Sequence, residues 1–65
     1  MMPIIRVEMF KGRNASEKRA LVKELTAGFV KTCGGTTQSV QIVITDVDKG
    51  DWGSGGELCS EKFPD

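Results

Sequence analysis

The first ten residues alternate between apolar and other side chains, which is the pattern of a β-strand. Ile5, Val7 and Met9 fall on one face, whereas Arg6 falls on the other. Successive side chains of a strand point to opposite faces of a sheet, so this period of two predicts a strand with one covered face. Lys11-Gly12-Arg13 breaks the alternation and is expected to end the strand.

An amphipathic helix is predicted from about Ser16 to Thr32. Charged residues occupy one side, and the apolar positions recur on the other side at spacings of three and four: Leu21, Val22, Leu25, Phe29 and Val30. Asn14 and Ser16 are candidate N-caps, and Glu17 follows Asn14 by three residues as in a capping box. Gly34-Gly35 is expected to end the helix, since glycine favours the position after the last turn.

Val40 to Thr45 is rich in β-branched residues and predicts a second strand. A strand, a helix and a strand make a β-α-β unit, in which the two strands lie parallel with a right-handed crossover. From Asp46 onward the chain is rich in turn residues, which indicates a glycine-rich C-terminal hairpin or tail with Leu58 and Phe63 as apolar anchors. The sequence therefore predicts an α/β (α+β) fold, with residues 1–65 as a single domain.

Two parallel strands are too little sheet to close a core, because parallel sheets normally need cover on both faces. The 65 residues contain no His and only two cysteines, Cys33 and Cys59, so a structural zinc site cannot be assembled and a disulfide framework is not expected. A domain this small then needs a partner. We expect the sheet to be completed by homo-oligomerisation.

The net charge of zero argues against a nucleic-acid partner, and no apolar run is long enough to cross a membrane. The charge is unevenly distributed. Residues 1–45 carry seven basic and three acidic side chains, a net +4, and residues 46–65 carry six acidic and two basic ones, a net −4. Either this is an ordinary acidic tail, or the tail lies on the basic body of another subunit. With no secretory signal, we expect a cytoplasmic protein with reduced thiols.

The chemistry available to the chain is restricted, because without His no Ser/His/Asp or Cys/His set exists. Gly53-Ser54-Gly55-Gly56 lacks the lysine of a phosphate-binding loop. Cys33 is expected to pack as a small apolar residue rather than to act as a reactive thiolate. Lysine, arginine and an N-terminal amine are the remaining candidates for a base or an anion-binding group.

Four segments of the chain resemble the 4-oxalocrotonate tautomerase family in residue type, order and spacing. They are Pro3-Ile4-Ile5-Arg6-Val7, Lys11-Gly12-Arg13, Ser39 to Thr45, and Lys49 to Leu58. Each motif is short, but together they extend over nearly the whole chain. The resemblance implies a cofactor-independent and metal-independent isomerase that interconverts the enol and keto forms of a 2-oxo acid, of the kind used in aromatic catabolism.

The resemblance also implies the site residues. Pro3 falls on the family's N-terminal proline, the catalytic base, and Arg13 falls on an arginine that binds the substrate carboxylate. Trp52 falls on the aromatic residue that forms an apolar wall, and Phe10 lies beside the expected pocket, where core packing is an equally good interpretation. The implied assembly is a hexamer, with a trimer or a dimer as alternatives, and sites shared between subunits.

The sequence departs from the family pattern at two places. Gln41 stands where the best-characterised members have a second arginine, which favours a monocarboxylate over a dicarboxylate substrate, because Gln supplies a hydrogen bond but no charge. Met1-Met2 precedes Pro3, and an initiator methionine is efficiently removed only before a small residue. Either translation starts at Met2 and excision exposes Pro3, or Pro3 keeps an amide nitrogen that is not basic.

Three functions therefore remain open. The first is the isomerase, with Pro3 as general base. The second is a lyase, hydratase or dehalogenase, in which a protonated proline acts as an acid and a carboxylate such as Glu8 or Asp51 activates water. The third is a non-catalytic oligomer that keeps the fold, for which Met1-Met2 is the supporting feature.

Overall fold

Two parallel strands form the centre of the molecule. In the computed structural model, which describes residues 2–63, strand β1 spans Ile4–Phe10 and strand β2 spans Gln41–Val47. They pair in parallel along their whole length, from Ile4 opposite Gln41 to Phe10 opposite Val47. The predicted β-α-β unit is confirmed. Strand β1 ends at Phe10, directly before Lys11-Gly12-Arg13, as expected.

Strand β2 ends at Val47, two residues beyond its predicted end at Thr45. The charged residue in this extension, Asp46, is paired with a cation of the helix. Asp46 lies in β2, and its side chain accepts a hydrogen bond from the ammonium of Lys18 on the helix. Helix and strand are thereby joined by an ion pair that is about one-third exposed on each side. A polar residue at this position is therefore compatible with the strand, although sequence periodicity alone argues against it.

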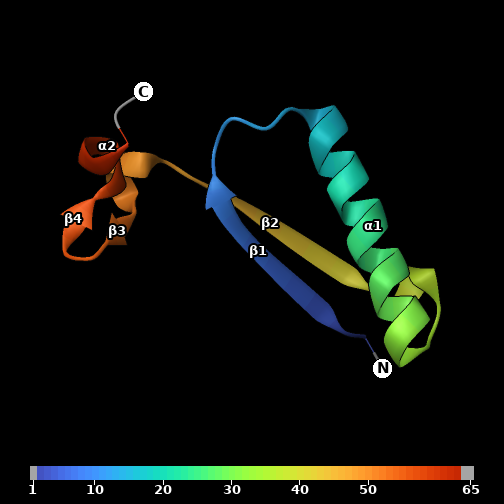
Figure 1. Ribbon diagram of the computed structural model, residues 1–65. Helices are drawn as coiled ribbons and strands as arrows, with labels where there is room; N and C mark the ends of the chain where they lie inside the picture. Colours follow the sequence, from blue (N-terminus) through green and yellow to red (C-terminus); the bar gives the residue numbers. More distant parts are fainter. Residues whose placement is uncertain (1, 64–65) are drawn as a thin grey trace.

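Helix α1 spans Ala15–Cys33 and covers one face of the two-stranded sheet (Figure 1). Asn14 is the N-cap: its side chain accepts from the backbone N–H of Glu17 at 2.8 Å, and the Glu17 carboxylate accepts from the N–H of Asn14 at 3.0 Å. This capping box is the one that the sequence predicts. Gly34 ends the helix with a φ of 85°, a conformation that costs glycine least.

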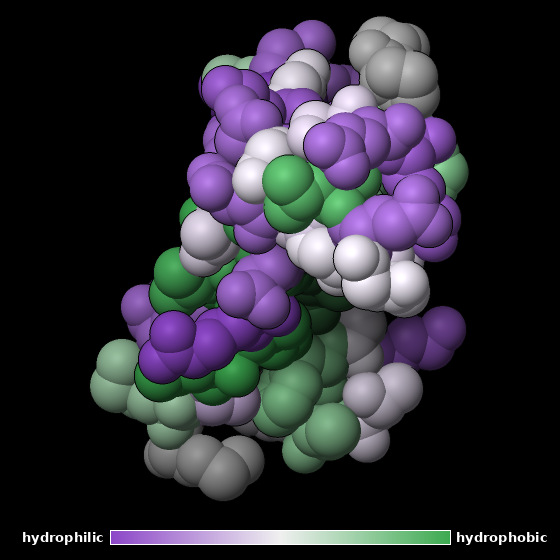
Figure 2. Space-filling view, turned by 90° about the vertical axis from the view of Figure 1, so that its left-hand side faces the viewer, coloured by the Kyte–Doolittle hydropathy of each residue, from purple (hydrophilic) through white to green (hydrophobic). Residues whose placement is uncertain are grey.

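The opposite face of the sheet is uncovered in the single chain. Residues paired across a parallel ladder share a face, and those facing the helix, such as Val7 and Ile44, are half-buried. On the other face Ile4 is 57% and Val43 45% exposed. Figure 2 shows apolar surface in the lower half of this view, crossed by hydrophilic side chains. The sheet thus has an unpartnered, mixed apolar and polar face.

The C-terminal arm, residues 48–63, projects from the end of β2 on the side away from α1 (Figure 1). It contains the single-turn 3-10 helix η2 (Lys49–Asp51), the antiparallel strands β3 (Gly53–Ser54) and β4 (Glu57–Leu58), and the short helix α2 (Cys59–Lys62). Gly55 and Gly56 form the two-residue hairpin turn with φ values of 63° and 87°, as a turn matching the strand twist requires. Another 3-10 turn, η1 (Thr37–Ser39), connects α1 to β2.

Very little of the described chain is buried. Only Val40, at 8% exposure, and Cys59, at 1%, are buried apolar residues within residues 2–63. Leu58 and Phe63, the expected apolar anchors of the arm, are exposed. The buried apolar residue of the arm is Cys59 instead. The radius of gyration is 14.8 Å, whereas a compact chain of this length has about 10.7 Å. The accessible surface is 4919 Å², against about 4,100 Å² for a folded monomer of this mass.

None of the described helices has both the length and the apolar character that crossing a membrane requires. Both cysteines are free thiols, with Cys33 exposed and Cys59 buried.

Asn14→Ala is expected to destabilise the protein by about 1 kcal/mol, because it removes one half of the capping box and leaves a helix N–H without its acceptor. Urea unfolding followed by circular dichroism measures the change. Asn14→Ser, which can still cap, is the matched control and is expected to keep most of the stability. An equal loss in both variants would contradict the capping argument.

Candidate functional site

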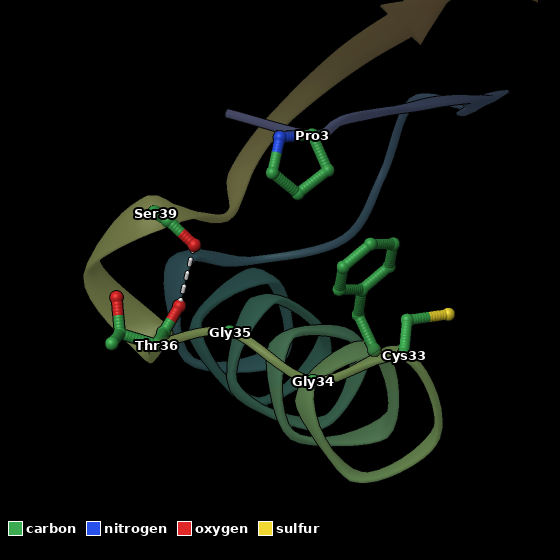
Figure 3. Close-up of a pocket in the computed structure, with 7 residues that line it drawn as sticks. Pro3, Cys33, Gly34, Gly35, Thr36 and Ser39 are labelled. Carbon is green, nitrogen blue, oxygen red and sulfur yellow. Dashed lines mark hydrogen bonds between the residues drawn. The ribbon is translucent and has the colours of Figure 1, made fainter. Parts of the chain in front are cut away.

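Pro3 lies at the edge of a cavity of about 260 Å³ where α1 returns to the start of the sheet (Figure 3). The carbonyl oxygen of Pro3 accepts a hydrogen bond from the N–H of Gln41 at 2.9 Å, which fixes Pro3 at the beginning of the strand pair. The remaining wall comes from the last turns of α1 and the loop after it: Phe29, Cys33, Gly34, Gly35, Thr36 and Ser39.

The polar groups of this cavity are neutral. Ser39 Oγ donates to the carbonyl oxygen of Thr36 at 2.8 Å, and no residue lining the cavity carries a formal charge. Cys33 is exposed here, so its expected role as a packed apolar residue is wrong. The helix carboxyl end beside the cavity adds partial negative charge. A carboxylate ligand would therefore find no cationic side chain in this cavity.

The sequence indicated Pro3 but not the rest of this wall, because Phe29 was assigned to the packed face of the helix and Gly34-Gly35 only to the end of the helix. The predicted topology does place these residues near Pro3. In a β-α-β unit the helix runs antiparallel to both strands, so its carboxyl end and the following loop must return to the amino ends of the strands.

The other predicted site residues gather at the opposite end of β1. The Phe10 and Trp52 rings pack edge to face, with centroids 4.6 Å apart and an interplanar angle of 64°. Arg13 Nη1 donates to the carbonyl oxygen of Phe10 at 3.4 Å. Lys49 Nζ lies 5.9 Å from the centroid of the Phe10 ring, within the range of a cation–π contact. Phe10 is thus contacted by an aromatic ring and by two cations.

Trp52 also borders a second cavity, of about 230 Å³, lined by Glu8, Val47, Asp51, Trp52 and Gly53. Glu8 extends from β1, and Asp51 ends the short helix η2. The sequence offers either of these two carboxylates as a group that could activate water, and both line this cavity.

A charge pair holds the start of the arm to the end of the sheet. Lys11 Nζ lies 2.9 Å from Asp48 Oδ2, and Asp48 Oδ1 accepts from the N–H of Gly50 at 2.9 Å. The hydrogen bond from Gly50, then that from Lys11, lowers the pKa of the Asp48 carboxyl. The same pairing with Asp48 raises the pKa of Lys11. The backbone N–H of Lys11 also donates to the carbonyl oxygen of Val47 at 3.0 Å.

Pro3 does not meet the other predicted residues within one chain. Strand β1 has seven residues, which span about 20 Å at 3.3 Å per residue, and Pro3 precedes it while Phe10 ends it. Phe10, Arg13 and Trp52 therefore form one cluster, and Pro3 belongs to a separate one. Neither location offers a metal site: within residues 2–63 no three His, Cys, Asp or Glu side chains come together as ligands.

Comparison with known proteins gives one consistent family. The family model described as "Tautomerase enzyme" matches residues 3–62. The chain is 35% identical over 60 residues to a 2-hydroxymuconate tautomerase of Pseudomonas putida, covering 92% of this chain and 95% of that protein. Among solved structures, TomN, a 4-oxalocrotonate tautomerase homologue of the tomaymycin biosynthetic pathway, superposes with a TM-score of 0.91 at 30% identity and 97% coverage of both chains. A 4-oxalocrotonate tautomerase isozyme of Methylibium petroleiphilum gives a TM-score of 0.88 at 28% identity, with coverages of 94% and 98%.

Acidification is expected to weaken the attachment of the arm through Asp48. A carboxyl whose pKa is lowered by folding contributes stability above its unfolded pKa, near the reference value of 3.8, and loses it as the pH falls through the folded pKa. Asp48→Asn is therefore expected to be less stable than the parent protein at neutral pH and to lose less stability between pH 5 and pH 2.

Urea midpoints measured across that pH range test this expectation. Asp51→Asn, an exposed carboxylate directly after Gly50 that no described ion pair contains, is the matched control. Parallel pH profiles for the parent and Asp48→Asn would show that the contacts of the Asp48 carboxylate with Gly50 and Lys11 contribute nothing.

Proposed function

The chain belongs to the 4-oxalocrotonate tautomerase family of isomerases, and on this premise we propose that it interconverts the enol and keto forms of a 2-oxo acid with Pro3 as the general base. The observation that carries the proposal is the separation of two incomplete clusters by one strand. The Pro3 cavity has a candidate base and no cation, and the Phe10 end has cations and an aromatic wall but no base.

Pro3 can act as a base only when it is the first residue. An internal proline nitrogen is an amide with neither proton nor basicity. A free α-amine has an ordinary pKa of about 7.7–8.0, and an apolar wall such as Phe29 favours its neutral form. Such an amine is suited to remove the proton of an enol hydroxyl and to return it to carbon, because its pKa lies near the working pH.

Arg13 would bind the carboxylate next to the reacting carbonyl. A guanidinium presents a planar fork of donors that matches a carboxylate, and it stabilises negative charge that develops on the enolate oxygen. Trp52, packed on Phe10, would form the apolar wall that excludes water. The reaction itself needs neither a metal nor a cofactor, since it moves one proton between oxygen and carbon.

Because Pro3 and Arg13 lie at opposite ends of the strand, a complete site needs at least two subunits. The uncovered face of the sheet and the extended arm supply surface for such contacts. We propose a homo-oligomer, a hexamer by family resemblance, in which the Phe10 end of one subunit faces the Pro3 cavity of another. The excess of about 800 Å² over a compact monomer matches the roughly 800 Å² per partner of a standard interface.

A hydratase or dehalogenase activity is the second candidate, and the cavity beside Trp52 favours it. Glu8 and Asp51 line this cavity together, and either carboxylate could take a proton from water while the protonated Pro3 donates one to the substrate. The outcome depends on whether water reaches the assembled site. A purely structural, non-catalytic role remains the alternative when Pro3 is blocked.

The first test compares two forms of the protein that differ only at the start. A chain released by a protease so that it begins at Pro3 is expected to tautomerise phenylenolpyruvate or 2-hydroxymuconate. A chain that keeps Met1-Met2 is expected to show less than about 1% of that rate, because its Pro3 nitrogen is an amide. Intact-mass measurement verifies each first residue. Inactivity of the Pro3-first chain, or equal activity of the two forms, would overturn the base assignment.

Arg13→Met is expected to lower kcat/KM by about tenfold to a hundredfold, since charge-assisted hydrogen bonds contribute about 1.5–3 kcal/mol. Arg13→Lys should restore only part of it, because an ammonium lacks the planar fork. Arg19→Met, on the exposed side of α1, is the control and is expected to keep the parent value. Equal losses in the Arg13 and Arg19 variants would point to a general charge effect instead of a carboxylate contact.

A further inference from the structure

Arg6 and Glu8 are two opposite charges on the uncovered face of the sheet. They lie two positions apart on β1, and both are exposed. Their neighbours across the ladder are neutral, with Val43 beside Arg6 and Thr45 beside Glu8. Within residues 2–63 neither side chain takes part in an ion pair or a hydrogen bond. Covering this face would therefore bury two charges, which is costly unless each one gains a partner.

The outer edge of β1 is also unpaired. The sheet has two strands, so one edge of β1 forms the ladder with β2, and no described strand lies along the other edge. In Figure 1 this outer edge faces away from α1. An edge strand presents a row of free N–H and C=O groups to any strand that can pair with it. The two unpaired charges thus lie beside an open position in the sheet.

The sequence of β1 is complementary to itself when the strand is reversed about its central residue, Val7. An antiparallel pair of β1 strands centred there gives every residue of the strand a partner. The opposite pairs, each formed twice, are Arg6 with Glu8, Ile5 with Met9, and Ile4 with Phe10. Directly opposite side chains share a face, with Cβ atoms about 4.5–5.5 Å apart, which is close enough for an ion pair. Charged residues meet opposite charges, and apolar residues meet apolar ones.

Shifted registers lose this match. A pair of strands centred on Arg6 places two guanidinium groups opposite each other, and a pair centred on Glu8 does the same with two carboxylates. Like charges directly opposite are unfavourable. Both shifts also leave part of each strand unpaired. The two charges therefore select one register, which an uncharged strand would specify only weakly.

Strand β2 does not offer an equivalent edge. An antiparallel pair centred on Ile44 would place the Asp46 carboxylate opposite the apolar side chain of Ile42, and Asp46 is already paired with Lys18. A contact between β1 of one copy and β2 of another joins unlike edges and does not close at two copies, whereas β1 against β1 does. The open edge of β1 is thus suited to the same edge of a second copy.

We propose that Arg6 and Glu8 select a second copy of this chain as the partner of β1, through two reciprocal ion pairs across an antiparallel contact of the two strands. The inference rests on the proposed function for the existence of a homo-oligomer, and it adds which residues choose the subunit and the register. Because the strands run in opposite directions, Pro3 of one copy lies beside the Phe10 end of the other, with Arg13 three residues further on. The contact that pairs the charges thereby also joins the two incomplete clusters.

Reversing one charge tests the pairing. Arg6→Glu puts carboxylates opposite each other in both pairs, and Glu8→Arg does so with guanidinium groups. Each variant is expected to raise the concentration at which the subunits dissociate by about tenfold. Analytical ultracentrifugation of diluted full-length protein measures it. Arg19→Glu and Glu24→Arg make the same reversals on the exposed side of α1 and are expected to match the parent.

Mixing the two variants separates a pairing defect from a folding defect. In a mixed pair one chain is acidic and the other basic at both positions, so both ion pairs form again between unlike chains. An equimolar mixture is expected to associate within about threefold of the parent and to give mixed species, which native mass spectrometry resolves by mass. The double variant Arg6→Glu/Glu8→Arg restores both pairs between identical chains and is expected to self-associate like the parent.

A cross-link reports the register independently of charge. On a Cys33→Ser background, Val7→Cys places two thiols opposite each other, within the Cα separation that a disulfide requires. Mild oxidation is expected to give a disulfide-linked dimer. Ile5→Cys, on the same face of the same strand, is the matched control. Its two thiols would lie four residues apart along the ladder, about 13 Å, and are expected not to cross-link.

Three results would overturn the inference: association of Arg6→Glu and Glu8→Arg like the parent, no recovery in the mixture or in the double variant, or a cross-link in Ile5→Cys instead of Val7→Cys. Turnover of phenylenolpyruvate by the parent chain beginning at Pro3 is assayed separately. Charge-dependent pairing without turnover would disprove the proposed isomerase and leave the pairing in place. Turnover by a protein whose assembly ignores both charges would do the reverse.

Discussion

The parallel pairing of β1 with β2 is the constraint on which the rest of the structure depends. It requires a helix antiparallel to both strands, which returns the carboxyl end of α1 to Pro3 and leaves the sequence after Phe10 and after Val47 at the far end. Because a paired strand is rigid and about 20 Å long, no local adjustment can bring Pro3 to Arg13 in one chain. The division into two clusters is therefore a consequence of the topology.

The same pairing explains why the single chain buries so little. One helix covers one face of two strands, and only Val40 and Cys59 become buried among residues 2–63. The arm has a small centre of its own around Cys59, whose N–H donates to the carbonyl oxygen of Trp52 at 2.8 Å. Polar contacts such as Lys11–Asp48 orient the arm but do not replace a core, since exposed ion pairs contribute little. The small buried core and the two separated clusters are both consistent with the homo-oligomer proposed above.

Local sequence signals predicted the elements well, because each depends on near neighbours. The Asn14 capping box, the glycines after α1 and the alternation of β1 are contained within a few residues. The predictions that were wrong concern residues whose partners are distant in the sequence. The extension of β2 through Asp46 depends on Lys18, and the burial of Cys59 instead of Leu58 depends on how the hairpin closes. The candidate site followed the same rule: Pro3 and Arg13 were proposed from motif resemblance, whereas the contact of Lys49 with the Phe10 ring needed the structure.

Strand β2 also determines how charge is distributed between the two clusters. A cation at its first residue would lie beside Pro3 of the same subunit, and Gln41 leaves that position neutral. Lys49, two residues after the end of this strand, lies over the Phe10 ring instead, and Arg13 donates to the Phe10 carbonyl oxygen. In the proposed assembly, which joins the Phe10 end of one subunit to the Pro3 cavity of another, both cations would then approach Pro3, the proposed base, from the same neighbour. Charge near the amine would thus depend on the subunit contact, because a cation within about 4–6 Å disfavours the protonated amine. The base would become neutral, and so reactive, at lower pH in the assembled protein than in a separated chain.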